Sequence, residues 1–257
     1  MKLENKVAVV TGAGSGLGLA TCRVLADAGV RVVGLDVHSS RLQALDDALA
    51  GRGISRVTDV AKDDDVKDAI AKALSTYGAV HIAINCAGVV DAAKTVSKGQ
   101  ACALEVWDKV IAINLTGTFN IIRHAAAAML RNEPEAGRGE RGVIVNTASG
   151  AAWQGQVGQA AYSASKAGVM GLTLPVARDL APHGIRVVSI APGMFDTAMA
   201  AGLPDTVLGG IVDKMILYPN RLGHPEEFAG LARHIVENSY INATTISVDG
   251  GARISTR

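Results

Sequence analysis

Short runs of β-branched residues alternate along this chain with longer segments rich in Ala and Leu, and this alternation restricts the fold more than any other feature. It predicts a parallel sheet, because parallel neighbours need a helix-length crossover between them. The runs Val7–Val10 and Val143–Val145 are apolar without alternating, which is typical of strands covered on both faces. The expected strands lie near residues 6–11, 31–36, 54–57, 80–85, 142–148, 185–191 and 244–248.

Seven strands with right-handed crossovers predict a doubly wound α/β sheet of the Rossmann type, flanked by helices. The 257 residues suffice for one large domain and no composition shift marks a linker, so we expect a single domain over residues 1–257. Residues 132–142 predict a solvated loop. The mixture of Met, Leu, Gly and Pro over residues 195–221 predicts a mobile apolar flap. Its glycines, Gly202, Gly209 and Gly210, make the backbone flexible when no ligand is bound.

The composition argues against several classes of function. A formal net charge of +1 gives no support for binding nucleic acid or an anionic membrane, and no run approaches the roughly 18 apolar residues of a membrane span. The three cysteines and six histidines lack metal-site spacing, so we expect no metal. The first strand follows directly on a short polar segment without targeting features, which predicts a cytoplasmic protein.

A glycine-rich turn joins the first expected strand to the first expected helix. In this context, the backbone N–H groups of the turn and the helix N-terminus can bind a pyrophosphate. A literal Gly-x-Gly-x-x-Gly is absent, and the spacing that fits is Gly12, Gly16 and Gly18. A purely structural turn with surplus glycines is the alternative.

Asp36 ends the second expected strand, 24 residues after Gly12. A carboxylate there would accept hydrogen bonds from an adenosine ribose and repel a 2′-phosphate, so NAD is favoured over NADP. Val37 follows it, and the glycine turn holds no Arg or Lys. Arg41 is near enough in sequence to bind a 2′-phosphate, although on a helix it could equally be a solvated side chain.

Two further strand ends lie at the same edge of the expected sheet, where ligands bind in such folds. We expect them to line the adenine and the ribose, and a plain cap of the strand end is the alternative for each. Cys86 is expected to pack beside the cofactor rather than to act as a nucleophile, since no histidine is near it. The residues are Asp59, Val60, Asn85, Cys86, Ala87 and Gly88.

Tyr162 and Lys166 lie four residues apart in a helical segment, and Ser149 precedes the tyrosine by thirteen residues. A separation of four places a phenol and an ammonium on one helix face. Bringing the pKa of a tyrosine from about 10 to about 7 takes roughly 4 kcal/mol, which one cation supplies at ~4 Å with an effective dielectric near 20. Tyr162 could thus be a general base, with the Ser149 hydroxyl holding the reacting oxygen. Accidental placement on a solvated helix face is the alternative.

In this order and spacing, these residues make the chain resemble the short-chain dehydrogenase/reductase family over essentially its whole length. Within the family, it is most similar to the type 2 3-hydroxyacyl-CoA dehydrogenases, also described as 17β-hydroxysteroid dehydrogenase type 10. The similar stretches are 142–149, 155–166, 174–182 and 220–225.

The resemblance implies roles for residues that the pattern alone does not reach. Asn114 would be the fourth catalytic residue, holding the water that links Lys166 to solvent. Gln156 would contact the acyl carbonyl region, together with Ser149 and Tyr162. Tyr162 and Lys166 would also contact the cofactor, as would Ser15 and Leu17 at its pyrophosphate and Pro192, Gly193, Phe195 and Thr197 at its nicotinamide end.

The expected function is NAD-dependent oxidation of a secondary alcohol, most plausibly a 3-hydroxyacyl-CoA in fatty acid metabolism, by a homotetramer. The alternatives are a hydroxysteroid dehydrogenase, a 3-ketoacyl-acyl-carrier-protein reductase and, from a different class, a non-catalytic subunit of an RNA-processing complex. The chain departs from its relatives at Gly150, Trp153 and Gln154, which adjoin the expected substrate pocket.

Overall fold

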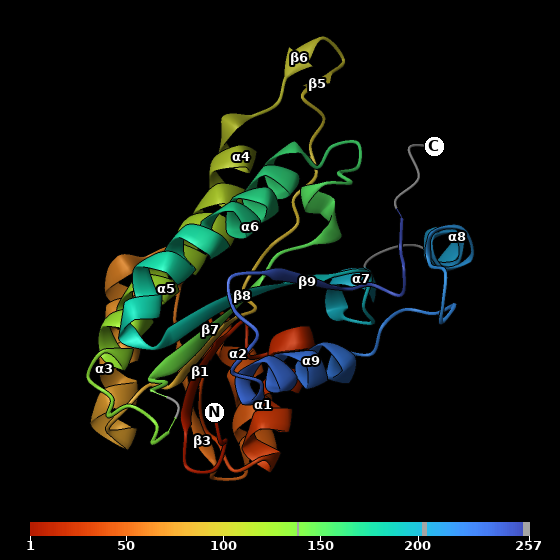
Figure 1. Cartoon of the computed structure of the whole chain (residues 1–257). Coiled ribbons are helices and arrows are strands. Elements are labelled where there is room, and N and C mark those ends of the chain that lie inside the picture. Colours follow the sequence, from red (N-terminus) through yellow and green to blue (C-terminus); the bar gives the residue numbers. More distant parts are fainter. Residues whose placement is uncertain (138, 202–204, 254–257) are drawn as a thin grey trace.

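The computed structural model describes residues 1–137, 139–201 and 205–253. Its main feature is a seven-stranded sheet in which every neighbouring pair is parallel, with strand order β3-β2-β1-β4-β7-β8-β9 (Figure 1). The predicted doubly wound α/β fold is therefore confirmed. The strands are β1 (Val7–Thr11), β2 (Arg31–Asp36), β3 (Gly53–Val57), β4 (Ile82–Asn85), β7 (Gly142–Thr147), β8 (Ile185–Pro192) and β9 (Thr245–Val248).

Helices cover both faces of this sheet. The side chains of β1 show the two layers, since Ala8 and Val10 belong to one apolar cluster and Val7 and Val9 to the other. The first cluster takes its helical residues from α1 (Gly16–Asp27), α2 (Ser39–Leu49) and α9 (Pro225–Glu237), and the second from α3 (Asp63–Tyr77), α5 (Gly117–Met129) and α6 (Ala160–Leu180).

Local sequence explains how several helices begin and end. Three aspartates fill the first turn of α3, where the helix dipole favours negative charge, and Gly78 ends the helix in the left-handed conformation. Helix α9 begins with Pro225, and the Glu227 carboxylate accepts the backbone N–H of His224.

The remaining elements are short and lie mostly around the carboxyl edge of the sheet. Helix α4 (Leu104–Ile111) leads through a π-helical turn (Ala112–Thr116) into α5. Short 3₁₀ turns precede and follow α6, at Gly150–Ala152 and Ala181–His183. A hairpin of β5 (Val96–Ser97) and β6 (Gln100–Ala101), which the sequence pattern did not predict, projects from the body (Figure 1).

The segment predicted as a flap contains α7 (Ala198–Ala201) and α8 (Asp205–Met215). Its first residue, Phe195, belongs to the core rather than to a flap, because its ring is only 7% exposed and packs edge-on against Phe228, with 6.4 Å between the ring centroids. Gly202 lies outside the described residues. The mobility of this segment stays a prediction.

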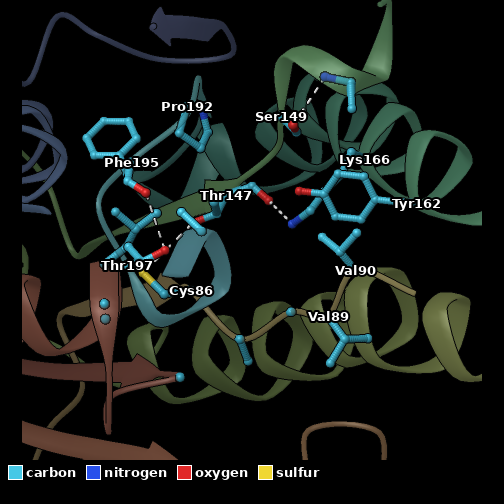
Figure 2. A pocket seen from close by; sticks show the side chains of 18 of the residues that line it. Cys86, Val89, Val90, Thr147, Ser149, Tyr162, Lys166, Pro192, Phe195 and Thr197 are labelled. Carbon is cyan, nitrogen blue, oxygen red and sulfur yellow. Dashed lines mark hydrogen bonds between the residues drawn. The ribbon is translucent and has the colours of Figure 1, made fainter. Parts of the chain in front are cut away.

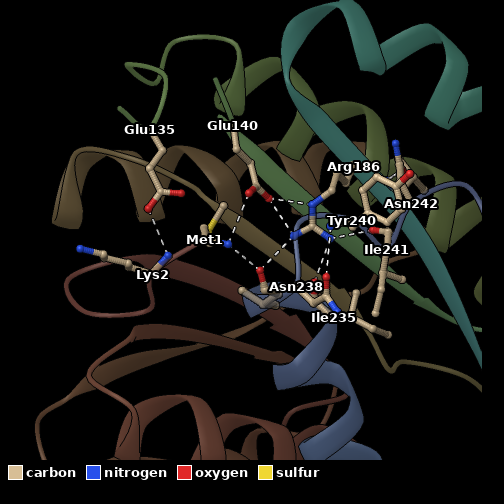
Figure 3. A network of polar contacts seen from close by, with 12 residues as sticks. Met1, Lys2, Glu135, Glu140, Arg186, Ile235, Asn238, Tyr240, Ile241 and Asn242 are labelled. Carbon is tan, nitrogen blue, oxygen red and sulfur yellow. Dashed lines mark hydrogen bonds and ion pairs between the residues drawn. The ribbon is translucent and has the colours of Figure 1, made fainter. Parts of the chain in front are cut away.

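The segment 132–142 is a loop as predicted, but it is not fully solvated. Glu140 is buried and forms an ion pair with Arg186 at the start of β8 (Figure 3). Strand β3 ends at Val57, so Asp59 and Val60 follow the strand rather than end it. None of the described helices combines the length and the apolar character that crossing a membrane requires.

Candidate active site

A cavity with a volume of about 970 Å³ follows the carboxyl ends of the central strands. Most of the predicted site residues lie around it, although they come from distant parts of the sequence. Those that line it are Gly12, Ser15, Gly16, Leu17, Gly18, Asp36, Asp59, Val60, Cys86, Ala87, Gly88, Ser149, Gln156, Tyr162, Lys166, Pro192, Gly193, Phe195 and Thr197.

Asn85 is not among the lining residues, and its predicted role in cofactor binding stays a prediction. Its side chain is buried and donates from Nδ2 to Oδ1 of Asn146 at 2.9 Å. The pair bridges β4 and β7, which are neighbours in the sheet. The side chain of Asn85 therefore links two strands, and the lining begins at Cys86.

The glycine turn has a backbone that other residues could not adopt without strain. Gly12 and Gly16 have φ values of 62° and 49°. A Cβ at Gly12 would lie 2.9 Å from the backbone nitrogen of Ala87, and one at Gly18 would lie 2.2 Å from the carbonyl oxygen of Gly12. The predicted spacing thus coincides with the two glycines of the turn that have positive φ, Gly12 and Gly16, and with Gly18, which packs against the carbonyl of Gly12.

The Asp36 carboxylate supports the same turn. It accepts the N–H of Gly14 on Oδ2 and the N–H of His38 on Oδ1, both at 3.0 Å. Asp36 is buried but still lines the cavity, whereas Arg41 lines it from an exposed position on α2. The carboxylate is therefore fixed in place beside the cavity.

The loop after β4 is held by a residue that sequence reasoning missed. The Thr11 hydroxyl accepts the N–H groups of Cys86 and Ala87, at 3.1 and 3.0 Å. Burial raises the pKa of the Cys86 thiol to about 11, which fits the predicted packing role. Asp59 accepts the N–H of Ala61 at 3.0 Å, so it caps its turn as well as lining the cavity.

Tyr162, Lys166 and Ser149 meet on one side of the cavity (Figure 2). The tyrosine and the lysine project from the first turns of α6, and the Lys166 Nζ lies 5.8 Å from the centre of the Tyr162 ring. The Lys166 ammonium is buried and donates to the carbonyl oxygen of Thr147 at 2.7 Å. Ser149 caps the 3₁₀ turn that follows β7, because its Oγ accepts the N–H of Ala151 at 3.1 Å.

The electrostatics of this group differ from the expectation in one respect. Burial raises the pKa of Tyr162, and a hydrogen bond with Ser149 lowers it in part. The predicted lowering by Lys166 is not found, since its ammonium is directed at Thr147. Burial also lowers the pKa of Lys166 to about 8. The protein alone therefore holds the phenol in its neutral form.

Asn114 lies next to this group without lining the cavity. It sits within the π-helical turn, a local defect often found at functional sites. Its Oδ1 accepts the N–H of Val89 at 2.8 Å, and its Nδ2 donates to Ser165 Oγ at 3.1 Å. A Cβ at Gly88 would lie 3.2 Å from Asn114 Oδ1 and 3.5 Å from Lys166 Nζ, so both side chains border the same small space.

Sequence reasoning also missed several apolar residues that line the cavity. Ala198 and Met215 do so from the segment predicted as a flap, where the apolar composition was the signal, and Met194 does so from the position just before that segment. Val89, Val90 and Ile113 line it from the stretch after β4 and the π-helical turn, and no motif marked them. Outside the masked positions, no cluster of three or more metal-ligating side chains is present.

Comparison with known proteins places this geometry in context. The family model of the short chain dehydrogenases matches residues 6–207. The chain is 48% identical over 254 residues to human 3-hydroxyacyl-CoA dehydrogenase type-2, which covers 98% of this chain and 97% of that protein. It is 46% identical to the protein of the same name from Drosophila melanogaster, with coverage of 98% and 99%. The crystal structure of 3-hydroxyacyl-CoA dehydrogenase type-2 from Mycobacterium avium superposes with a TM-score of 0.93 at 37% identity, covering 98% of both chains.

Proposed function

The chain belongs to the short-chain dehydrogenase family, and from this premise we propose that it uses NAD to oxidise the 3-hydroxyl group of an acyl-CoA. As a member of this family with dehydrogenase relatives, it is an oxidoreductase that acts on CH–OH donors. The observation that carries the proposal is the convergence of Ser149, Tyr162 and Lys166 on the cavity that the glycine turn also lines.

The cavity fits a dinucleotide. Gly12 and Gly16 leave the backbone of the turn accessible at the start of α1, where N–H groups and the helix dipole favour a pyrophosphate. Gly150 lines the cavity with nothing within 4 Å of a Cβ built on it, so a side chain there would occupy the open space. Pro192, Gly193 and Thr197 would hold the nicotinamide end, and Lys166 its ribose.

In the proposed reaction, Tyr162 accepts the proton of the substrate hydroxyl. Ser149 orients the reacting oxygen beside the phenol, and its hydrogen bond favours the phenolate. Lys166 supplies positive charge within the buried group, and Asn114 supports the release of the proton toward solvent. A bound oxidised nicotinamide would supply the hydride acceptor and a further positive charge that opposes the effect of burial on Tyr162.

NAD is proposed in preference to NADP because of Asp36. Its carboxylate is held beside the cavity by two backbone N–H groups, so it could not turn away from a 2′-phosphate without losing them. Its burial would strengthen that repulsion. Arg41 also lines the cavity, and it is the side chain that could answer a phosphate in the alternative.

The acyl-CoA substrate is proposed from the names of the relatives and from the cavity. Gln156 borders the same cavity as Ser149 and Tyr162, in a position to contact the acyl carbonyl. The apolar residues Met194, Ala198 and Met215 offer a surface to the acyl chain. Closure of the part of the segment 195–221 that follows Phe195 over this surface would exclude water during hydride transfer.

We also propose a homotetramer. Large apolar side chains are exposed on α4, α5 and α6, among them Trp107 at 40%, Phe119 at 47% and Leu174 at 41%. Paired surfaces of this kind would cover them in an assembly. Sedimentation equilibrium would test the proposal, and a monomer at micromolar concentration would contradict it.

The proposed activity is tested by following NADH absorbance with acetoacetyl-CoA, a 3-ketosteroid and an acetoacetyl-acyl-carrier-protein thioester, each with both reduced nicotinamides. We expect the highest kcat/KM with acetoacetyl-CoA and NADH. A higher value for one of the other substrates would replace the proposed substrate and keep the reaction type. Absence of turnover together with a shift of tRNA in a gel would favour the RNA-complex alternative, for which the net charge of +1 gives no support.

A further inference from the structure

Three cationic side chains of Lys or Arg line the cavity within the described ranges, and one of them, Lys166, has a hydrogen-bond partner. Arg41 lies at the Asp36 end, where a Cβ added to Gly14 would be 2.5 Å from Arg41 Cβ and 2.9 Å from Asp36 Oδ2. Lys166 is buried and bonded to the Thr147 carbonyl. The third, Lys214, is not explained by the proposed chemistry.

Lys214 lies in the last turn of α8, four residues after Gly210, and both line the cavity. This spacing places them on one face of the helix. Lys214 is exposed, and no ion pair joins it to another described residue. The acid that lines the cavity beyond β9, Asp249, already accepts the N–H of Gly251 at 2.9 Å and pairs with Arg253 at 3.4 Å. The Lys214 ammonium is therefore available to an external anion.

The surroundings of Lys214 indicate the chemistry of that anion. Met215, the next residue of α8, lines the same cavity, and so does Met194, so the cation belongs to a cavity with apolar lining. Helix α8 lies at the outer edge of the molecule, apart from α6 (Figure 1), and Arg253 N donates to the Met215 carbonyl at 2.9 Å. A ligand that reaches from Tyr162 to Lys214 would need an uncharged arm that ends in an anion.

We propose that Lys214 binds a phosphate group of the CoA moiety and thereby favours CoA thioesters over substrates without phosphate. The inference rests on the proposed acyl-CoA substrate and adds a specificity-determining residue to it. In a CoA thioester, the acyl group and the pantetheine arm are uncharged, and the anions are the diphosphate and the 3′-phosphate. An ammonium at the rim of the cavity, away from the reacting group, matches that distribution of charge.

The test compares acetoacetyl-CoA with acetoacetyl-N-acetylcysteamine, a thioester that has the same reacting group and no phosphate. We expect Lys214→Gln to raise KM for acetoacetyl-CoA about five- to tenfold, as loss of one charge-assisted hydrogen bond would, with kcat nearly unchanged. KM for the truncated thioester should stay within about twofold, and Lys214→Arg should retain most of the affinity for CoA. The thioester of dephospho-CoA distinguishes the two anions, since it keeps the diphosphate and lacks the 3′-phosphate.

Lys72→Gln is the matched control, because Lys72 is an exposed lysine of α3 that does not line the cavity. Equal KM for acetoacetyl-CoA in wild type and Lys214→Gln would overturn the inference. An equal increase in KM for both thioesters would also overturn it, because this result would show that Lys214 acts through the packing of α8. Failure of the wild type to reduce either thioester would overturn the proposed function itself, a result distinct from both of these.

Discussion

Arg186 and Glu140 form an ion pair that is almost completely buried, with 2.7 Å between Arg186 Nη2 and Glu140 Oε1 (Figure 3). Arg186 also donates to the carbonyl oxygens of Ile235, Val236 and Ile241. One guanidinium thus joins the start of β8, the end of α9 and the loop before β7. Such an arginine satisfies groups that would otherwise be buried without partners.

Arg186→Met should lower the free energy of unfolding by about 3–5 kcal/mol, because it leaves the buried Glu140 carboxylate with the Met1 ammonium, 3.3 Å away, as its remaining ion-pair partner among the described residues. Urea denaturation followed by circular dichroism measures this. The control is Arg233→Met, which removes an exposed ion pair with Glu237 and should change stability by about 0.5 kcal/mol or less. Similar losses in the two variants would contradict the assigned importance of burial.

Cofactor preference should follow Asp36, with kcat/KM at least about tenfold higher for NAD than for NADP. A fixed carboxylate facing a phosphate costs more than the ~1.4 kcal/mol that this ratio represents. Steady-state kinetics with both cofactors measures it. Asp36→Asn, which keeps an acceptor for one of the two backbone N–H groups, should reduce the ratio. Comparable kcat/KM values for NAD and NADP in the wild type would mean that Arg41 binds the 2′-phosphate.

Tyr162→Phe should lower kcat by at least about a hundredfold, the lower end of the contribution of a general base. Binding of NADH, measured by fluorescence titration, should change by no more than a few fold, because the phenol acts on the substrate proton. Lys166→Ala should lower kcat and also weaken NADH binding, since the lysine is proposed to contact the ribose of the cofactor as well. A Phe variant with near-normal kcat would require another base.

The kcat for alcohol oxidation should rise with pH, because the base must lose its proton before it can accept one. Burial raises the pKa of Tyr162 in the protein alone, whereas Ser149 and the charge of the bound oxidised nicotinamide act in the opposite direction. We expect an inflection well below pH 10, and a preference for lower pH in the reduction direction. An inflection near 10 would show that these charges do not overcome burial.

Stability should fall as the pH drops from about 7 to 5, in part through His81. Burial lowers the pKa of His81 to about 4, and its Nδ1 accepts the N–H of Val7, so the folded protein holds the neutral ring. The unfolded chain binds a proton near pH 6.5, and the free energy of unfolding therefore decreases below that pH. The lowered pKa of Glu227, about 2, acts only under more acidic conditions.

His81→Asn would keep an acceptor for Val7 without a group that titrates in this range. Urea midpoints of the two proteins at pH 7 and pH 5 give the comparison. The loss between the two pH values should be smaller in the variant. An equal loss would assign the pH dependence to other residues.

The sequence predicted what depends on local pattern. Strand positions follow from apolar runs, and the helical spacing of Tyr162 and Lys166 places both side chains on the cavity. It did not predict which groups meet across the sheet. The contact of Thr11 with the loop after β4 requires that β1 and β4 be neighbours, and the pairing of Asn85 with Asn146 requires the same of β4 and β7.

Electrostatics were the least predictable part of the site. The spacing of four residues predicted that the Lys166 ammonium would interact with the Tyr162 phenol. In the structure, the ammonium donates a hydrogen bond to the carbonyl of Thr147, which ends a strand nineteen residues earlier in the chain. In the same way, the charged composition of 132–142 predicted a solvated loop, but Glu140 of this loop is buried in an ion pair with Arg186. Burial of a charge depends on partners that the neighbouring sequence does not reveal.

The two hydrogen bonds at the Thr11 hydroxyl join the ends of β1 and β4 into a single preformed floor. A ligand that settles on such a floor has little backbone to order there, so less of its binding energy is lost as entropy. Elsewhere the cavity is lined by residues of the short helices α7 and α8, among them Ala198 and Met215. Motion of α7 and α8 would then set the rates at which the cofactor and the product dissociate. Substitutions in these helices would change the residence times of the ligands more than their equilibrium affinities.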